Sequence, residues 1–110
     1  MLSEAMLCTL RLGHEARERY VANTLAVGGA AVLDAWDSEW YQKIDLKKLA
    51  RNENGVGILE QIFGSHAEGV QKLNLSEYMQ EALGFICPNN THTSMLIRAW
   101  TYEVQRRMQK

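Results

Sequence analysis

The residues that could carry out chemistry are few, and the first pair lies between residues 57 and 75. In this stretch, GILEQIFGSHAEGVQKLNL, His66 and Glu68 are two positions apart. Side chains at this spacing do not share a helix face, whereas helical metal sites use residues four apart. The pair alone is therefore a weak metal signal, and a helix-start or packing role is the simpler interpretation of His66.

A thiol and an imidazole lie close together later in the chain. Cys87 precedes Pro88, and His92 follows within a few residues. Nucleophilic catalysis would require the imidazole to lower the pKa of the thiol. No hydrolase signature surrounds this pair, so a small Cys/His hydrolase or metalloprotein is kept only as the last functional alternative. Its residues would be Cys87, His92, His66 and Glu68.

Phosphate and dinucleotide motifs do not match either. Gly55-Val56-Gly57 has no third glycine at the required spacing and no strand before it, and no P-loop pattern occurs. We therefore expect no catalytic residues, no cofactor and no metal.

Cationic residues gather near both ends of the chain. The 12 Lys and Arg are balanced by 13 Asp and Glu, which leaves a net charge of −1 and removes the global attraction that a nonspecific nucleic-acid binder needs. Cations near a helix C-terminus also stabilise the helix dipole. A nucleic-acid-associated regulator is thus the first alternative rather than the main hypothesis. It would use two groups of cations. The first is Arg11, Arg17 and Arg19, and the second is Arg98, Arg106, Arg107 and Lys110.

Three aromatic residues lie close together between residues 36 and 41. Trp36, Trp40 and Tyr41 provide more aromatic surface than one short segment normally buries, so part of it is expected to form an interface hot spot, with simple core packing as the competing interpretation. Together with Arg106 and Arg107 they are the predicted protein-binding residues.

Length and composition indicate one helical domain, residues 1–110. Apolar residues make up 46% and charged residues 23%, typical of a folded globular protein. A single proline and few β-branched residues argue against an all-β fold. The apolar run from Leu25 to Leu33 is too short to span a bilayer, and Glu4 interrupts any signal-peptide pattern, so we expect an intracellular protein without a membrane segment, its two cysteines being buried thiols.

The pattern predicts one long central helix in an all-α fold. A helix start at Ser3-Glu4 is favoured over a strand, and residues 14–36 form the central helix. Its apolar stripe is Val21, Leu25, Gly28, Val32 and Ala35 or Trp36, flanked on one side by Tyr20, Thr24, Val27 and Ala31. Gly28 and Gly29 predict the close approach of another helix. Asp45 is expected to cap a short helix through Ala50.

Several short helices and an amphipathic C-terminal helix complete the predicted bundle. A first short helix carries Ile58, Leu59, Ile62 and Phe63 and should end at Gly64. Ser65 should cap a second short helix and Ser76 a third. The third should end at Gly84. Gly69 is expected to let a neighbouring helix approach. The helix capped by Ser65 would bury Ala67, Val70 and Leu73. The helix capped by Ser76 would bury Met79, Ala82 and Leu83. A final helix from Thr93 to Met108 would bury Leu96, Trp100, Val104 and Met108.

The order of short motifs resembles small bacteriophage and prophage proteins of actinobacteria. These motifs are GGAAVLDAW, IDLKKL, ILEQIFGSHAEGVQKLNL, ALGF and LIRAWTYEVQRR, between residues 25 and 107. His66 stands where tyrosine is usual in those proteins, which favours a packing role. The resemblance implies a phage accessory protein without an agreed enzymatic activity.

Taken together, these patterns favour a protein-binding module that acts stoichiometrically on a host or phage protein in the host cytoplasm. Inhibition of a host defence system is one special case. Self-association through the glycine-lined face of residues 14–36 or through the terminal helix is a further expectation. The partner itself is not identified by the sequence.

Overall fold

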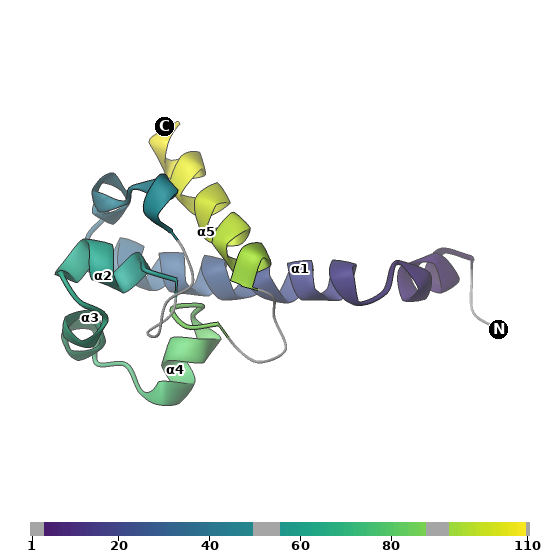
Figure 1. Cartoon of the computed structure of the whole chain (residues 1–110), viewed down its shortest axis with the longest axis horizontal. Helices are drawn as coiled ribbons and strands as arrows, with labels where there is room; N and C mark the ends of the chain where they lie inside the picture. Colours follow the sequence, from purple (N-terminus) through teal and green to yellow (C-terminus); the bar gives the residue numbers. More distant parts are fainter. Residues whose placement is uncertain (1–3, 50–55, 88–92, 110) are drawn as a thin grey trace.

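The computed structural model describes residues 4–49, 56–87 and 93–109, with side chains from residue 19 onward, and these residues are helical without any strand (Figure 1). The predicted all-α fold is thus confirmed. The α-helices are α1 (Glu4–Trp36), α2 (Ile58–Phe63), α3 (His66–Leu73), α4 (Glu77–Ala82) and α5 (Thr93–Met108), and the 3-10 helices are η1 (Trp40–Lys43) and η2 (Leu46–Lys48).

The long helix α1 organises the molecule. The two predicted N-terminal segments are one continuous helix, whose first part extends away from the other elements (Figure 1). The short helices and α5 gather around its C-terminal half, with α5 crossing on one side and α4 lying on another. The C-terminal half of α1 therefore contributes to the shared core.

The buried face of α1 lies one position away from the predicted stripe. Val21, Leu25, Gly28 and Val32 are only half-buried, and the prediction that they form the central stripe was wrong. Small side chains let the other elements approach closely, which large ones at the contact would prevent. The residues that are buried instead are Ala22, Ala26, Gly29, Ala30 and Leu33.

The predicted close approach at the glycine pair is confirmed at Gly29. A Cβ atom there would overlap the carbonyl oxygen of Leu83 and lie 2.7 Å from carbons of the Trp100 ring. Trp100 is fully buried, and its indole Nε1 donates to the carbonyl oxygen of Gly84 at 2.7 Å. The face of α1 at Gly29 is thus occupied by Leu83 and Trp100 of the same chain. Self-association of the protein stays a prediction.

Aromatic rings fill the space between α1 and α5. The Trp100 ring stacks on Phe85 with centroids 5.6 Å apart and meets the Trp40 ring edge-on at 6.0 Å. All three side chains are fully or almost fully buried. The predicted burial of Leu96, Trp100 and Val104 in α5 is confirmed, whereas Met108 is 53% exposed because the last turn extends past the core.

Capping side chains set the ends of the short helices as predicted. The Ser65 and Ser76 hydroxyl oxygens accept hydrogen bonds from the backbone N–H groups of Glu68 and Met79, both at 3.1 Å. The Asp45 carboxylate likewise caps η2, although the predicted helix is only one 3-10 turn, and Ala50 lies outside the described residues. Capping fixes where these helices begin but not how deeply they pack.

The buried faces of α3 and α4 were predicted less well. Ala67, Met79 and Ala82 are exposed, while Val70, Leu73 and Leu83 are half-buried against the core. Both helices are short and cover the core from outside: α3 buries Gly69, and α4 has no fully buried residue. Gly69 does lie close to Leu59 of α2, as expected, and a Cβ atom at this position would not fit.

Gly64 is expected to be a sensitive position, because it joins α2 to α3 with a φ of +96°. Side chains are strained in this backbone region, and a β-branched residue most of all. Gly64→Val should reduce the free energy of unfolding by about 2 kcal/mol, measured by urea denaturation.

His66→Phe is the comparison for this variant. The His66 Nε2 atom forms a 2.8 Å hydrogen bond with Gln80 Oε1 on a half-buried site, which a phenyl ring would lose while retaining the packing. We expect a change below about 1.5 kcal/mol. If Gly64→Val were as stable as the parent protein, the hinge interpretation of Gly64 would be wrong.

Candidate functional site

The three predicted aromatic contact residues differ in exposure. Trp40 has no exposed surface, so its prediction as a surface contact residue was wrong: its indole Nε1 donates to Asp34 Oδ1 at 2.9 Å and its ring is part of the core. Trp36 is 42% exposed and packs against Phe63 with ring centroids 4.6 Å apart. Tyr41 is half-buried, with its ring edge-on to Trp40. The short segment therefore buries most of its aromatic surface.

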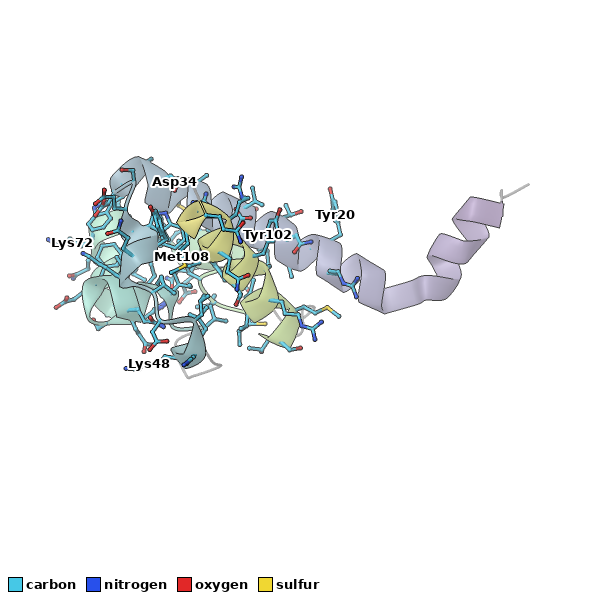
Figure 2. All side chains as sticks on the ribbon, turned by 90° about the horizontal axis from the view of Figure 1, so that it is seen from above. Tyr20, Asp34, Lys48, Lys72, Tyr102 and Met108 are labelled. Carbon is cyan, nitrogen blue, oxygen red and sulfur yellow. The ribbon has the colours of Figure 1, made fainter. Side chains whose placement is uncertain are left out.

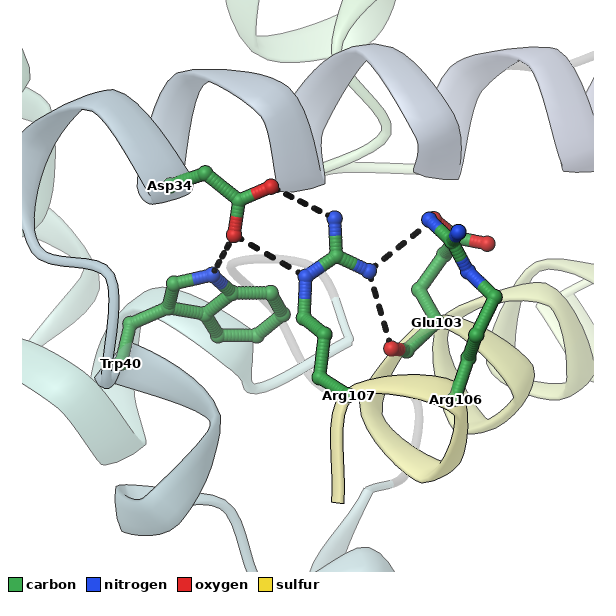
Figure 3. Close-up of polar contacts among 5 residues, drawn as sticks. All are labelled: Asp34, Trp40, Glu103, Arg106 and Arg107. Atoms are coloured by element: carbon green, nitrogen blue, oxygen red, sulfur yellow. Dashed lines mark hydrogen bonds and ion pairs between the residues drawn. The ribbon is translucent and has the colours of Figure 1, made fainter. Parts of the chain in front are cut away.

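The predicted contact residue Arg107 belongs to an ion-pair cluster that joins α5 to α1 (Figure 3). Its Nε and Nη2 atoms donate to the two carboxylate oxygens of Asp34 at 2.9 and 2.6 Å. Its Nη1 donates to the carbonyl oxygen of Glu103 at 2.9 Å and to Glu103 Oε1 at 3.2 Å. The guanidinium also lies 5.5 Å from the centre of the Trp40 ring. Arg107 is thus fully engaged within the chain.

The other cation of the cluster, Arg106, lies at its solvent edge. Its Nη2 donates to Glu103 Oε1 at 3.2 Å, and its side chain is 48% exposed, against 4% for Glu103 and 11% for Arg107. A hollow of about 310 Å³ lies beside the cluster, lined by Asp34, Ser38, Tyr41, Arg106 and Arg107. The buried carboxylate with two arginines indicates a structural clamp, in which Arg106 is the more exposed of the two arginines.

Hydrogen bonding from Arg107 lowers the pKa of Asp34 below its ordinary value of 3.8, against the opposing effect of partial burial. The same contact with Asp34 raises the pKa of Arg107. A carboxyl whose pKa is lower in the folded state stabilises the fold above its unfolded pKa, and this contribution is lost as the pH falls through the folded pKa.

Asp34→Asn should consequently lower stability near neutral pH and have little effect in acid. The Asp34 side chain is 41% exposed, and screening by water limits its contribution to below about 1 kcal/mol. The free energies of unfolding of the two proteins should differ at neutral pH and converge well below the ordinary carboxyl pKa of about 3.9. A difference that persists unchanged into acid would contradict the ion-pair account.

A larger hollow of about 520 Å³ lies where α5 crosses α1. We call it the α1–α5 groove, lined by Arg19, Asn23, Val27, Met95, Arg98, Ala99, Tyr102 and Glu103. Its α1 residues recur every four positions and its α5 residues every three or four, so each helix contributes one continuous edge. Val27 is 52% and Tyr102 63% exposed. The groove thus combines exposed apolar surface with charge.

Two features of the surroundings extend this surface. Tyr20, one residue after Arg19, is 72% exposed and projects from α1 (Figure 2). Arg19 and Arg98 come from the two basic groups of the sequence, which the fold brings to one groove. The sequence analysis missed this site, although it did place Tyr20 and Val27 on the side of α1 next to its supposed buried stripe.

The described contacts do not bring together the residues of the Cys/His hydrolase or metalloprotein alternative. His66 bonds with Gln80 of α4, and the Thr93 hydroxyl donates to Cys87 Sγ at 3.6 Å. His92, Lys110 and the side chains of Arg11 and Arg17 lie outside the described residues. Over the residues that the structure covers, no group of three His, Cys, Asp or Glu side chains could hold a metal ion. In the same part of the chain, no helix has the length and apolar character that crossing a membrane requires.

With this geometry established, the chain was compared with known proteins. No protein family, curated protein or solved structure matches it. The α1–α5 groove is therefore interpreted from its own chemistry.

Proposed function

We propose that this protein is a protein-binding module whose α1–α5 groove contacts its partner. The observation that carries the proposal is that the exposed side chains of Val27 and Tyr102 line one hollow between two helices, with the exposed Tyr20 next to the lining residue Arg19 on α1. Large exposed apolar patches commonly mark interaction sites, and tyrosine and arginine are frequent among residues that dominate binding energy. The groove offers both residue types.

The construction of the groove also suits binding. Its walls belong to α1 and α5, the two longest helices, which the Arg107 cluster and the buried Trp100 hold together. A rigid surface loses little conformational entropy when a partner binds, so more of the contact energy contributes to affinity. The protein would act stoichiometrically, by occupying a surface of its partner.

The resemblance to phage and prophage proteins supports the cellular setting of this proposal. A phage-encoded module would act in the host cytoplasm on a host or phage protein, and inhibition of a host defence system is the special case that a small stoichiometric binder suits. This setting rests on the short sequence motifs, whereas the binding surface rests on the groove.

Affinity capture with groove variants tests the proposal. Val27→Ser and Tyr102→Ser change exposed side chains, so both proteins should keep the circular dichroism spectrum and melting temperature of the parent. A partner captured by the parent protein from its host cells should be reduced at least tenfold with the double variant.

Lys48→Glu is the matched control, since Lys48 is exposed on η2 and takes no part in the groove. It should capture the partner as well as the parent does. Equal capture by the groove double variant and the parent would show that the partner binds elsewhere, and the proposal would then be abandoned.

A further inference from the structure

We propose that the occupant of the α1–α5 groove is an acidic amphipathic helix of the partner protein. This inference rests on the proposed function and adds the chemistry of the partner. Leucine-like side chains of the guest would lie against Val27 and Tyr102, and its carboxylates would meet the exposed Arg98. The argument has three parts, which concern charge, shape and the choice of macromolecule.

Arg98 gives the groove an exposed positive charge on its α5 edge. Arg19 also lines the groove, but it already has an interaction within the chain, so the charge argument rests on Arg98. Among the lining residues that the structure describes, Glu103 carries the one carboxylate; it is 4% exposed and is paired with Arg106 and Arg107, so its charge is compensated within the chain. An acidic partner complements this surface, and a basic one would be repelled at the rim.

The shape of the groove suits a helix. On α1 the lining residues run from Arg19 to Val27, and on α5 from Met95 to Glu103, so each edge covers about two turns or about 12 Å. A guest helix places anchors at positions i, i+3 or i+4, and i+7 over the same length. An extended peptide would instead seek an unpaired strand edge, and the described residues contain no strand. Two or three anchors of one amphipathic helix therefore match the groove.

The apolar floor favours a protein over a nucleic acid. Val27 and Met95 offer aliphatic surface, and Tyr102 is the one aromatic ring among the lining residues that the structure describes. Single-stranded nucleic acids are held by several stacking rings along a cationic track, and duplexes by many phosphate contacts. An exposed arginine beside an aliphatic floor corresponds better to the carboxylates and leucines of an amphipathic helix.

A titration with four probes tests the inference. The main probe is a synthetic helical peptide of about 16 residues, with leucine along one face and glutamate on both flanks. The second probe has lysine for every glutamate, the third has serine for every leucine, and the fourth is a single-stranded oligonucleotide. Binding is followed by fluorescence anisotropy of the labelled probe and by amide chemical shifts of the protein.

The acidic leucine peptide should bind at least tenfold more tightly than each of the other three probes. Its largest chemical-shift changes should fall on Asn23, Val27, Ala99 and Tyr102, which line the groove. Arg98→Glu should weaken this peptide at least tenfold and strengthen the lysine peptide, because Arg98 lies at the rim. Lys48→Glu, on exposed η2, should change neither affinity by more than twofold.

Three outcomes would overturn the inference while leaving the proposed function intact. Preference for the lysine peptide would assign the opposite charge to the partner. Tighter, groove-mapped binding of the oligonucleotide would assign a nucleic acid. Concentration-dependent dimerisation in sedimentation that Arg98→Glu abolishes would assign a second copy of the chain, whose α4 exposes Tyr78 and Met79 beside Glu77 and Glu81. If groove variants also left cellular capture unchanged, the proposed function would fail as well.

Discussion

Replacing Gly29 with alanine should destabilise the protein by about 3 kcal/mol, although alanine is the better helix former. The added methyl group would overlap the backbone carbonyl oxygen of Leu83 and lie 2.7 Å from the Trp100 ring. Neither neighbour can move easily, because Trp100 is fully buried and its indole is bonded to the Gly84 carbonyl. Urea denaturation would measure the loss as a lower midpoint with an unchanged slope.

Gly28→Ala is the matched control for this change. A Cβ atom at Gly28 would lie 3.4 Å from Leu83 Cδ2, which is ordinary contact with the end of a side chain. The gain in helix propensity should then dominate, so we expect this variant to be as stable as the parent or up to about 1 kcal/mol more stable. Similar effects of the two substitutions would contradict the close packing of α1 at Gly29.

Arg107→Met should reduce the free energy of unfolding by about 3 kcal/mol, as breaking a buried ion pair does. The arginine side chain is 11% exposed and contacts both Asp34 and the almost fully buried Glu103. Removing it leaves Glu103 with Arg106, which is 48% exposed, as its remaining ion-pair partner. Most of the loss therefore comes from a buried carboxylate without sufficient compensation, measured again by urea denaturation.

Two further variants separate this explanation from a general packing defect. Arg106→Ala removes the exposed arginine of the cluster, and we expect it to cost less than about 1 kcal/mol. Glu103→Leu in the Arg107→Met background removes the unpaired charge and should restore at least half of the lost stability. If the double variant were less stable than Arg107→Met alone, burial of the Glu103 charge would not be the cause.

Local chemistry explains why the ends of the helices could be predicted. Ser65 and Ser76 each precede a backbone N–H group three residues later that needs an acceptor, and Gly64 allows a backbone angle that other residues avoid. These signals act within four residues of the chain. The boundaries of α2, α3, α4 and α5 therefore follow from sequence with little dependence on the rest of the fold.

Packing between distant segments explains what the sequence did not reveal. Periodicity gives most weight to large apolar residues such as Val21 and Leu25, but α1 buries its small residues, because Trp100 and Leu83 approach there. Trp40 was counted as surface because the contact between its indole and Asp34 depends on how the chain turns after α1. A local sequence pattern contains neither the distance at which another segment approaches a helix nor the direction in which the chain turns after it.

The groove depends on the same long-range information. Arg19 and Arg98 lie at opposite ends of the sequence, and only the crossing of α5 over α1 brings them to one surface. The exposed side of α1 with Tyr20 and Val27 was visible as a pattern, yet its importance depended on the position of Tyr102. The sequence led only to the hypothesis of a binding protein, whereas the proposed binding surface required the structure.

The central claim is that the α1–α5 groove contacts a partner protein, and site-specific photo-crosslinking tests it most directly. A photoreactive phenylalanine analogue replaces Val27 in the groove or, as control, Lys48 on η2, both being exposed positions. After irradiation in cells that produce the protein together with its partner, the protein with the analogue at position 27 should form one discrete adduct of higher mass that the control does not form. Equal adducts from both positions, or an adduct from position 48 alone, would contradict the account.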